Sequence, residues 1–385
     1  MKKRTNDIVL VATVTILLTI GLIMVFSASA IVAQERHGSL IYFVQKQVLW
    51  GFLCILSIFV FSRLKFQVYT RRPLPLFMVL ISLILLAGLF PAGETVNGAR
   101  RWYDLKIGSF QPSEAAKLAL IIYFADIFSR KGNQLRDWKK GLLPHVIVFT
   151  SIIAFIFMQP DLSSALMIVL IIGSMALLSA IRFKHVLAGF FILLPALLIK
   201  MYTNGYQFNR IFSWWNNWNN PLGSGYQIKQ SLIGLGAGGF MGSGLGTSKQ
   251  KYLFLPDSHT DFIFSILGEE FGFIGTSLVL LLFMVILWRG IMIARRQTNP
   301  FGQYLAIGLT MNIVLYGLIN IAVVSMVFPT TGLPMPFLSY GGTSLLFSGI
   351  TVGILLNLSR NSSEPVPAVE MDRRQMIHKK LMISG

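Results

Sequence analysis

Long stretches without a charged residue are the feature that most restricts how this chain can fold. No Asp, Glu, Lys or Arg occurs between Asp7 and Glu35, between Arg72 and Glu94, or between Lys140 and Asp161. Each stretch holds the roughly 20 residues that a helix needs to cross a lipid bilayer. The stretch from Arg296 to Arg360 lacks all four residue types as well. We expect it to cross twice, with a break at the Pro and Gly cluster from 329 to 342.

The composition agrees with a membrane protein. Hydrophobic residues make up 54% of the chain and charged residues 12%, about half the charged fraction of soluble domains. The apolar run after the basic start, Met1 to Arg4, is too long for a cleaved signal peptide, and we predict a signal anchor. The one cysteine, Cys54, lies in a predicted span, so no disulfide can form within the chain.

Hydropathy and helix-breaking residues predict an all-α, polytopic membrane bundle of about ten transmembrane helices. The spans are expected near residues 8–29, 45–62, 74–91, 112–128, 143–159, 162–181, 186–203, 261–288, 303–326 and 343–358. We expect residues 1–360 to form one membrane domain and residues 361–385 a flexible cytoplasmic tail. A large extracytoplasmic loop, about 204–260, separates the seventh and eighth spans.

The basic residues predict the orientation of the chain. With ten spans both termini lie on one side, and 22 of the 33 Lys and Arg residues fall on that side. By the positive-inside rule this side is the cytoplasm. The net charge of +18 therefore reflects topology and attraction to anionic membrane lipids, and we expect no nucleic acid partner.

Three outer stretches carry irregular sequence near membrane depth: the long loop and residues 96–111 and 329–342. Irregular backbone at that depth survives where it is buried in protein or lines a wet cavity. We therefore expect the three stretches to build one outward-facing cavity. No convincing internal repeat is present, which disfavours an alternating-access transporter.

Nine acidic residues lie inside the spans or on their outer side, where a charge is costly and each is a candidate functional group. They are Glu35, Glu94, Asp104, Glu114, Asp161, Asp257, Asp261, Glu269 and Glu270. Asp257 and Asp261 stand out because they immediately precede the eighth span. Taken alone, the motif favours a simpler role, in which Thr260 or Asp261 caps the helix that begins at Phe262.

Glu269 and Glu270 lie deeper in the same span and need a proton or a positive partner. Lys117 is a candidate counter-charge, with Glu114 three residues earlier on the same helical face. A structural ion pair inside the membrane explains these residues as well as contact with a substrate does.

Three cations of the long loop, Arg210, Lys249 and Lys251, could bind a phosphate or pyrophosphate, although each taken singly fits a lipid head group better. The glycine-rich stretch 234–246 matches a dinucleotide-binding pattern, but no strand precedes it, and we expect its glycines to permit close packing. Three loop tryptophans predict an interfacial belt, with stacking on a sugar as the alternative: Trp214, Trp215 and Trp218.

The histidines give little indication of a metal site or a catalytic triad. His259 is the one histidine on the outer side near the acidic cluster. No spacing resembles a zinc site, and no Ser-His-Asp grouping can be argued.

Six short stretches occur in order on the predicted outer side: Gly98–Trp102, Phe110–Glu114 with Lys117, Gln159–Asp161, Gly225–Gln227 with Gln230 and Ser231, Leu255–Phe264, and Pro336–Gly342. With them the chain, from its first span to Arg360, resembles the SEDS (shape, elongation, division and sporulation) family, the group of FtsW, RodA and SpoVE. The sequence around Gly225 and Gly246 is more similar to the division and sporulation branch, that of FtsW and SpoVE, than to the elongation branch.

The resemblance implies a peptidoglycan glycosyltransferase of the bacterial cytoplasmic membrane. Its substrate would be lipid II, a disaccharide-peptide on undecaprenyl pyrophosphate, polymerised at the outer face. The Asp of the His-Thr-Asp-Phe motif, here Asp261, would be the general base, and this replaces the capping role. The family often has Glu where Asp257 stands, so Asp257 receives no role. Other residues expected to bind substrate are Trp102, Glu114, Lys117, Arg210, Gln227, Ser231, His259 and Ser339.

The implied reaction is an inverting transfer. The 4-hydroxyl of the acceptor sugar attacks the anomeric carbon of the donor, Asp261 takes the hydroxyl proton, and undecaprenyl pyrophosphate leaves. The leaving group needs positive charge, from Arg210, Lys117 or a divalent cation. The resemblance favours Mg²⁺ or Mn²⁺, and the sequence does not identify its ligands.

Two other functions are compatible with the sequence. A lipid II flippase would need a polar route through both leaflets, whereas the residues singled out above lie at the outer end. A non-enzymatic scaffold would recruit wall synthases. The resemblance implies a class B penicillin-binding protein, a transpeptidase, as partner, beside other divisome or elongasome proteins.

Overall fold

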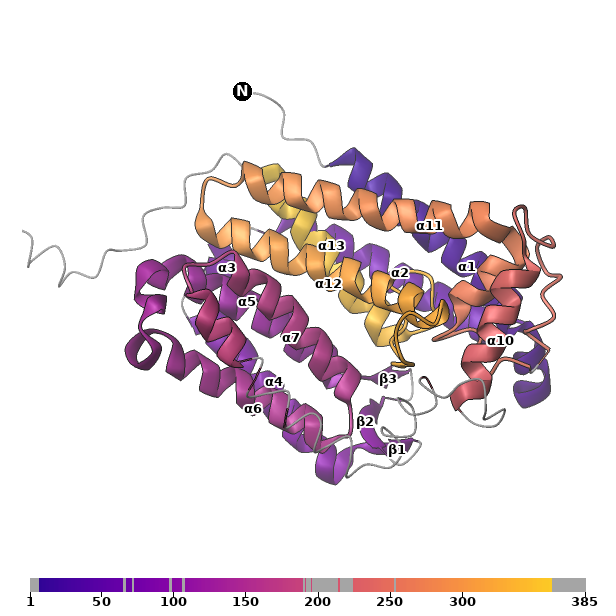
Figure 1. Ribbon diagram of the computed structural model, residues 1–385, viewed down its shortest axis with the longest axis horizontal. Coiled ribbons are helices and arrows are strands. Elements are labelled where there is room, and N and C mark those ends of the chain that lie inside the picture. Colours follow the sequence, from indigo (N-terminus) through magenta and orange to yellow (C-terminus); the bar gives the residue numbers. More distant parts are fainter. Residues whose placement is uncertain are drawn as a thin grey trace, which may run out of the picture.

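The computed structural model shows a bundle of long helices with a small sheet at one end (Figure 1). It describes residues 7–64, 67–70, 73–96, 99–105, 108–189, 191, 195, 214, 224–252 and 254–361. The helices are α1 (Ile8–His37), α2 (Tyr42–Arg63), α3 (Gln67–Thr70), α4 (Pro73–Ala92), α5 (Pro112–Lys131), α6 (Leu143–Met158), α7 (Leu162–Leu177), α10 (Ser224–Ala237), α11 (Ile263–Arg296), α12 (Pro300–Val324) and α13 (Gly342–Asn361). A 3-10 helix, η1 (Gly132–Arg136), and a π-helix, η2 (Trp138–Leu142), join α5 to α6.

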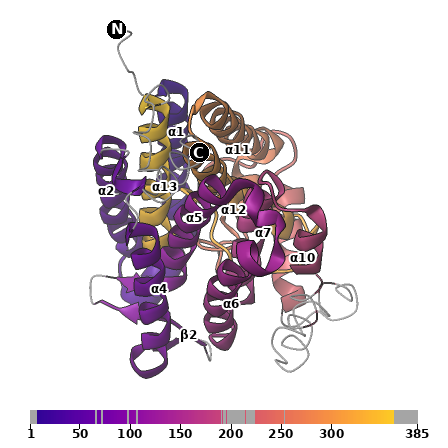
Figure 2. The same ribbon diagram turned by 90° about the vertical axis from the view of Figure 1, so that its left-hand side faces the viewer.

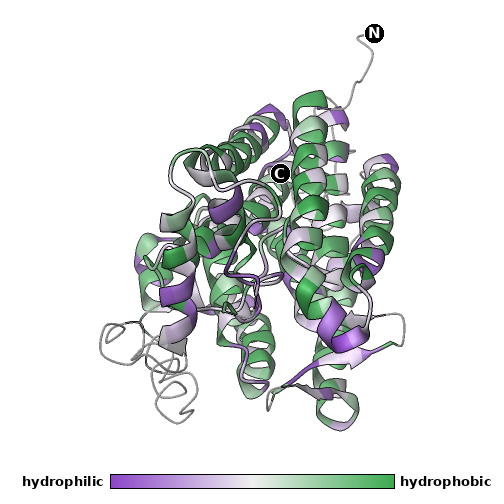
Figure 3. Ribbon diagram, turned by 90° about the vertical axis from the view of Figure 1, so that its right-hand side faces the viewer, coloured by the Kyte–Doolittle hydropathy of each residue, from purple (hydrophilic) through white to green (hydrophobic). Residues whose placement is uncertain are grey.

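The helices match a membrane-spanning protein. Within the described chain, α1, α2, α4, α11, α12 and α13 are long and apolar enough to cross a bilayer, and α6 and α7 are shorter apolar helices. Hydrophobic residues run along the helices and hydrophilic residues gather at their ends (Figure 3). With α5, nine of the ten predicted spans coincide with described helices, and the prediction of an all-α polytopic bundle is confirmed. The span expected at 186–203 and the tail after Asn361 lie largely or wholly outside the described residues.

Helix α5 lies at the centre of the bundle (Figure 2). It packs against α4, α7, α12 and α13, and nearly every residue from Pro112 to Phe128 is buried. Because protein rather than lipid surrounds it, its charged side chains need partners within the chain. Lys117 Nζ lies 2.9 Å from both carboxylate oxygens of Glu114. This ion pair explains how a helix with charged side chains is tolerated among apolar helices.

The helix ends define two faces. The C-terminal ends of α4, α6 and α12 lie with the N-terminal ends of α5, α7, α11 and α13, beside the sheet. Basic residues occupy the opposite ends, among them Arg63, Arg130, Arg295, Arg296 and Arg360. There Arg289 of α11 holds the carboxylate of Asp7, with Nε 2.9 Å and Nη2 2.5 Å from Oδ2, and so fastens α11 to the start of α1.

A three-stranded antiparallel sheet follows α4, and the sequence analysis did not predict it. Its strands are β1 (Glu94–Val96), β2 (Ala99–Asp104) and β3 (Ser109–Phe110), in the order β1-β2-β3. Trp102 pairs with Glu94, and Tyr103 pairs with Phe110. The Tyr103 hydroxyl donates to the Leu85 carbonyl at 2.7 Å and so fastens the sheet to α4. Paired aromatic residues of this kind favour strands.

Helix α11 is broken at Gly272, whose φ of 63° and ψ of −158° suit glycine and few other residues. The break removes helical partners from backbone groups, which need new ones inside a membrane. The carbonyls of Glu269 and Glu270 accept hydrogen bonds from the amides of Ser243 and Gly244, at 3.0 Å each. The segment after α10 thus crosses α11 at its break.

The glycines of residues 234–246 let this segment lie directly on α11. The Phe273 amide donates to the Gly239 carbonyl at 2.9 Å. A Cβ atom at Gly242 would lie 2.2 Å from the Glu270 carbonyl oxygen, far inside contact distance. The prediction that these glycines serve close packing is confirmed for Gly234, Gly238 and Gly242, whereas a Cβ atom at Gly236 or Gly239 would meet nothing within 4 Å.

The two carboxylates beside the break are bound by the same segment. Lys251 Nζ lies 3.3 Å from Glu270 Oε1, and the hydroxyl of Ser27 in α1 donates to that oxygen at 2.6 Å. Glu269 accepts a hydrogen bond from the Ser248 hydroxyl. Backbone amides complete the Glu269 site: Lys249 at 2.8 Å and Gln250 at 3.3 Å.

The prediction of Lys117 as counter-charge to Glu269 and Glu270 is therefore wrong. Lys117 is paired with Glu114 on its own helix. The correct partner, Lys251, is buried beside Glu270, so it is also not a cation of the outer cavity. Sequence spacing reveals neighbours on one helix, whereas this contact depends on a loop folding back over α11.

We predict that replacing Lys251 with Met lowers stability by about 3 to 5 kcal/mol, because it leaves Glu270 buried without its counter-charge. The measurement is the apparent melting temperature of the detergent-purified protein. Lys249→Met is the matched control, since the Lys249 side chain is exposed and only its backbone binds Glu269. Adding Glu270→Gln to Lys251→Met should restore part of the loss. Equal melting temperatures for the two single variants would refute the role of the ion pair.

Candidate functional site

A cavity of about 710 Å³ opens among the helix ends that carry the sheet. Two of the predicted outer stretches, 96–111 and 329–342, contribute to its wall, the third contributes Asp257 and Thr260, and Asp261 follows directly at the start of the eighth predicted span. For the described residues, the prediction that the three stretches build one cavity is confirmed. Helices α2, α5, α7, α12 and α13, strand β1 and the turn between α6 and α7 supply the rest of the lining.

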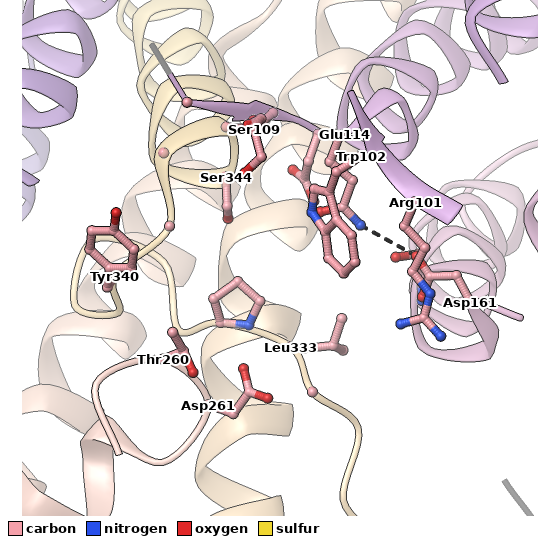
Figure 4. Close-up of a pocket in the computed structure, with 18 of the residues that line it drawn as sticks. Arg101, Trp102, Ser109, Glu114, Asp161, Thr260, Asp261, Leu333, Tyr340 and Ser344 are labelled. Atoms are coloured by element: carbon pink, nitrogen blue, oxygen red, sulfur yellow. Dashed lines mark hydrogen bonds between the residues drawn. The ribbon is translucent and has the colours of Figure 1, made fainter. Parts of the chain in front are cut away.

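Asp261 lies on the turn that leads into α11, and its carboxylate points into the cavity (Figure 4). The carbonyl of Asp257, a residue with a φ of 53°, accepts hydrogen bonds from the amides of Thr260 and Asp261, at 3.1 Å each. The N-cap of α11 is Phe262, without a side-chain capping bond. The capping role considered for Thr260 or Asp261 is therefore wrong, and the Asp261 side chain is directed to the cavity instead.

Asn320 of α12 holds the backbone of this turn. Its Nδ2 donates to the carbonyls of Asp261 and Leu333, at 2.8 Å each, so one buried amide joins the turn to the loop from 329 to 340. The sequence analysis missed this residue. The signal was available, because an amide inside an apolar span needs a partner.

Ser339 and His259 support the same turn from behind. The Ser339 hydroxyl donates to the Thr260 carbonyl at 2.5 Å, and the Tyr340 amide donates to the His259 carbonyl at 2.9 Å. The His259 ring packs against Phe43 and Tyr340. Burial lowers the pKa of His259 to about 4, so the ring is neutral at neutral pH. Neither Ser339 nor His259 belongs to the cavity lining, and substrate binding by them stays a prediction.

Trp102 and Glu114 face Asp261 across the cavity (Figure 4). Lys117 lies beneath them, buried, with its Nζ 3.8 Å from the centre of the Tyr316 ring. Tyr316 of α12 also lines the cavity, and the sequence analysis missed it. The predicted residues Asp261, Glu114 and Trp102 thus share one cavity, and Lys117 acts on it through Glu114.

Asp161 and Arg101 form the wall beside Trp102. Asp161 caps α7 by accepting from the Ser164 amide at 3.2 Å, and it also accepts from Gln111 Nε2 at 3.3 Å (Figure 4). Arg101 donates to the carbonyls of Gln159 and Pro160 and thereby fastens β2 to the turn between α6 and α7.

The remaining predicted site residues are not in the described lining. Ser231 is fully buried, and its hydroxyl donates to the Val324 carbonyl at 2.9 Å, joining α10 to α12. Gln227 is half-buried on α10, outside the lining. Arg210, Trp215 and Trp218 lie outside the described residues. Substrate binding by Gln227, Ser231 and Arg210 stays a prediction.

The described lining is strongly acidic. Six of the nine predicted acids line it: Glu94, Asp104, Glu114, Asp161, Asp257 and Asp261. The cations in the same lining are Lys46 and Arg101. Carboxylates suit Mg²⁺ or Mn²⁺. However, within the described chain no three Asp, Glu, His or Cys side chains converge to hold a metal ion, so the protein groups present do not by themselves build a metal site.

The fold and the cavity together define a multi-pass membrane protein with an acidic site at one end of its helices. The family model described as "Cell cycle protein", which represents FtsW, RodA and SpoVE, matches residues 8–364. The chain belongs to this family.

Curated relatives support the assignment. The chain is 40% identical over 362 residues to stage V sporulation protein E of Bacillus subtilis, covering 94% of this chain and 99% of the relative. It is 37% identical over 353 residues to the probable peptidoglycan glycosyltransferase FtsW of Trichlorobacter lovleyi, with 92% and 93% covered. The predicted resemblance to the division and sporulation branch is confirmed by these relatives.

Solved structures share the fold. A chain from the structure described as "Structural coordination of polymerization and crosslinking by a peptidoglycan synthase complex" superimposes with a TM-score of 0.76 at 24% identity, with 94% of this chain and 99% of that chain covered. The rod shape determining protein RodA of Thermus thermophilus matches with a TM-score of 0.69 at 23% identity and the same coverage.

We predict that Asn320→Leu loosens the Asp261 turn, because one buried and one partly buried carbonyl lose their donor, at a cost of about 1 to 3 kcal/mol. The Asp261 carboxylate should then react faster with a water-soluble carbodiimide, as measured by mass spectrometry. Asn312→Leu is the control, since Asn312 is a buried amide of the same helix that contacts Thr351 at 3.3 Å instead. Faster labelling in both variants, or in neither, would contradict a specific role of Asn320.

Proposed function

We propose that this chain is a peptidoglycan glycosyltransferase that polymerises lipid II into glycan strands. The observation that carries the proposal is the Asp261 carboxylate, fixed on a turn and directed into a cavity that Trp102 and Glu114 line from the other side. Several curated relatives are named probable peptidoglycan glycosyltransferases, at 34 to 37% identity. The match to the Trichlorobacter lovleyi relative covers more than nine-tenths of both chains, and this supports a common activity.

The proposal includes an orientation, with both termini in the cytoplasm of the bacterium and the cavity at the outer face of its membrane. Basic residues at the helix ends opposite the cavity support it, because Lys and Arg are retained on the cytoplasmic side. Lipid II has its sugars in water and its prenyl chain in the membrane. A cavity at one end of a helix bundle suits such an amphiphilic molecule.

In the proposed reaction Asp261 is the general base. Its carboxylate accepts the proton of the acceptor 4-hydroxyl, which must approach within about 3 Å. The hydroxyl oxygen forms a bond to the donor anomeric carbon while the bond from that carbon to the pyrophosphate breaks, with inversion. Glu114 is held in one position by Lys117, and Trp102 offers an aromatic face to a sugar ring. These two residues would orient the substrates.

The leaving pyrophosphate has to enter a cavity rich in carboxylates. Lys117 is a weak candidate for its counter-charge, because Glu114 already binds it beneath the cavity wall. A divalent cation, Mg²⁺ or Mn²⁺, brought in with the phosphate oxygens would neutralise both sets of charges.

We further propose that the chain works with a class B penicillin-binding protein and other divisome or elongasome proteins in the membrane. The structural match to a chain of a peptidoglycan synthase complex supports such an assembly. Flipping of lipid II is the competing function. It would need a polar path through both leaflets, whereas the cavity wall is formed by helix ends on one side.

We predict that Asp261→Asn lowers the rate of glycan formation from lipid II by about 100-fold or more, since the amide cannot take up the proton. Glycan length and amount are measured with purified protein on gels. Glu35→Gln, an exposed acid at the end of α1, should retain the wild-type rate. Asp257→Asn removes a charge from the same cavity and should cost less than tenfold, which separates the base from the general effect of charge.

An unchanged rate in Asp261→Asn would exclude it as the base. A vesicle assay that follows labelled lipid II across the bilayer should be run beside the polymerisation assay. Transfer across the bilayer without glycan formation would favour the flippase.

A further inference from the structure

Lys46 is a cavity cation that the reaction described above leaves unused. It lies near the outer end of α2, half-buried, and belongs to the cavity lining. Its Nζ donates to the Tyr42 hydroxyl at 2.7 Å and lies 4.4 Å from the centre of the Tyr42 ring. The Tyr42 ring is itself stacked on His37, with 3.7 Å between the ring centres. The amine is therefore held in place from one side.

The other lining cation is committed elsewhere. Arg101 donates to the carbonyls of Gln159 and Pro160, which fixes its guanidinium to the turn between α6 and α7. Lys46 has no carboxylate within ion-pair distance in the described chain, and its ammonium carries three donors, of which Tyr42 uses one. Both cations keep N–H donors, but the Arg101 guanidinium is held against two backbone carbonyls, whereas the Lys46 amine is held by one tyrosine hydroxyl.

Among the lining carboxylates, Asp104 interacts electrostatically with Lys46 from beyond ion-pair distance, and the start of α13 adds polar groups without negative charge. Helix α2 packs along α13, whose first residues Gly342, Thr343 and Ser344 line the same cavity. The amides of a first helical turn lack acceptors within the helix, and the helix dipole favours an anion there. The Ser344 side chain is directed into the cavity (Figure 4).

Trp50, one turn further along α2, keeps the two helices in close contact. A Cβ atom at Gly342 would lie 2.3 Å from Trp50 Cε2, and one at Gly108 would lie 2.6 Å from Cζ2. Gln47 donates to the Ser339 carbonyl at 3.2 Å as well. The indole and the start of α13 are thus packed together, and Lys46, one turn away on α2, lines the same cavity as the first turn of α13.

We propose that Lys46 and the first turn of α13 form the binding site for the diphosphate of a prenyl-linked substrate or product. The inference rests on the proposed polymerase function and names where its anionic group binds. The site lies against α2 and α13, away from Asp161 and Arg101. It offers a charge-assisted donor in a wall otherwise rich in carboxylates.

The test uses the full chain purified in detergent, with farnesyl pyrophosphate as the probe. Lys46→Gln should weaken its binding by about tenfold to a hundredfold, the loss expected for one charge-assisted hydrogen bond. Lys46→Arg should keep most of the affinity. Lys229→Gln, an exposed lysine of α10 outside the lining, is the matched control and should bind as the wild type does. In the polymerisation assay, Lys46→Gln should raise the KM for lipid II more than it lowers kcat.

The outcomes separate the two proposals. Equal farnesyl pyrophosphate affinity in Lys46→Gln and wild type would overturn the diphosphate site, even if both proteins polymerise lipid II. Loss of phosphatidylglycerol vesicle binding with unchanged farnesyl pyrophosphate binding would also overturn it, because the ligand would then be a membrane lipid head group. Lys46-dependent binding in a protein that forms no glycan would sustain the site and refute the polymerase.

Discussion

The break of α11 at Gly272 is the constraint on which the position of Asp261 depends. It separates the half-helix that starts just after Asp261 from the long remainder, and the freed backbone groups must be satisfied inside the protein. The segment after α10 supplies those partners, and Lys251 with Ser27 fixes the Glu270 side chain. The half-helix is therefore tied to α1 and to the outer segment. The turn that carries Asp261 is held at its other end by α12.

Charged side chains determine what the cavity can bind, just as packing determines its shape. One buried pair, Glu114 with Lys117, lies in the central helix, and five further carboxylates line the cavity with Glu114. A polyanionic substrate would be repelled from such a wall unless positive groups meet its phosphates. Helix α2, which otherwise faces lipid with apolar side chains, carries one such group in Lys46.

Particular residues show how far sequence reasoning reached. It predicted nine described spans because hydropathy depends on composition along one helix. It brought Asp261, Glu114 and Trp102 to one cavity because motifs at helix ends on the same side of a membrane converge. It missed the sheet, Asn320 and Lys46, and it assigned Lys117 to the wrong acids. The strands of the sheet are neighbours in the sequence, and hydropathy gave no signal for so short a hairpin. The contacts of Asn320 and of Glu270 join elements far apart in the chain, for which spacing carries no information.

The sequence by itself determined the class of this protein: uncharged runs long enough to span a bilayer, basic residues on one side, and motifs on the other. Each spanning segment must by itself be long and apolar enough to cross the membrane, so its own composition identifies it. Only the tertiary structure decided which carboxylate enters the cavity, which acids pair with Lys251, and which lysine keeps donors available for a ligand. Those choices arise from loops and helix ends meeting in space, where a few hydrogen bonds determine the direction of each side chain.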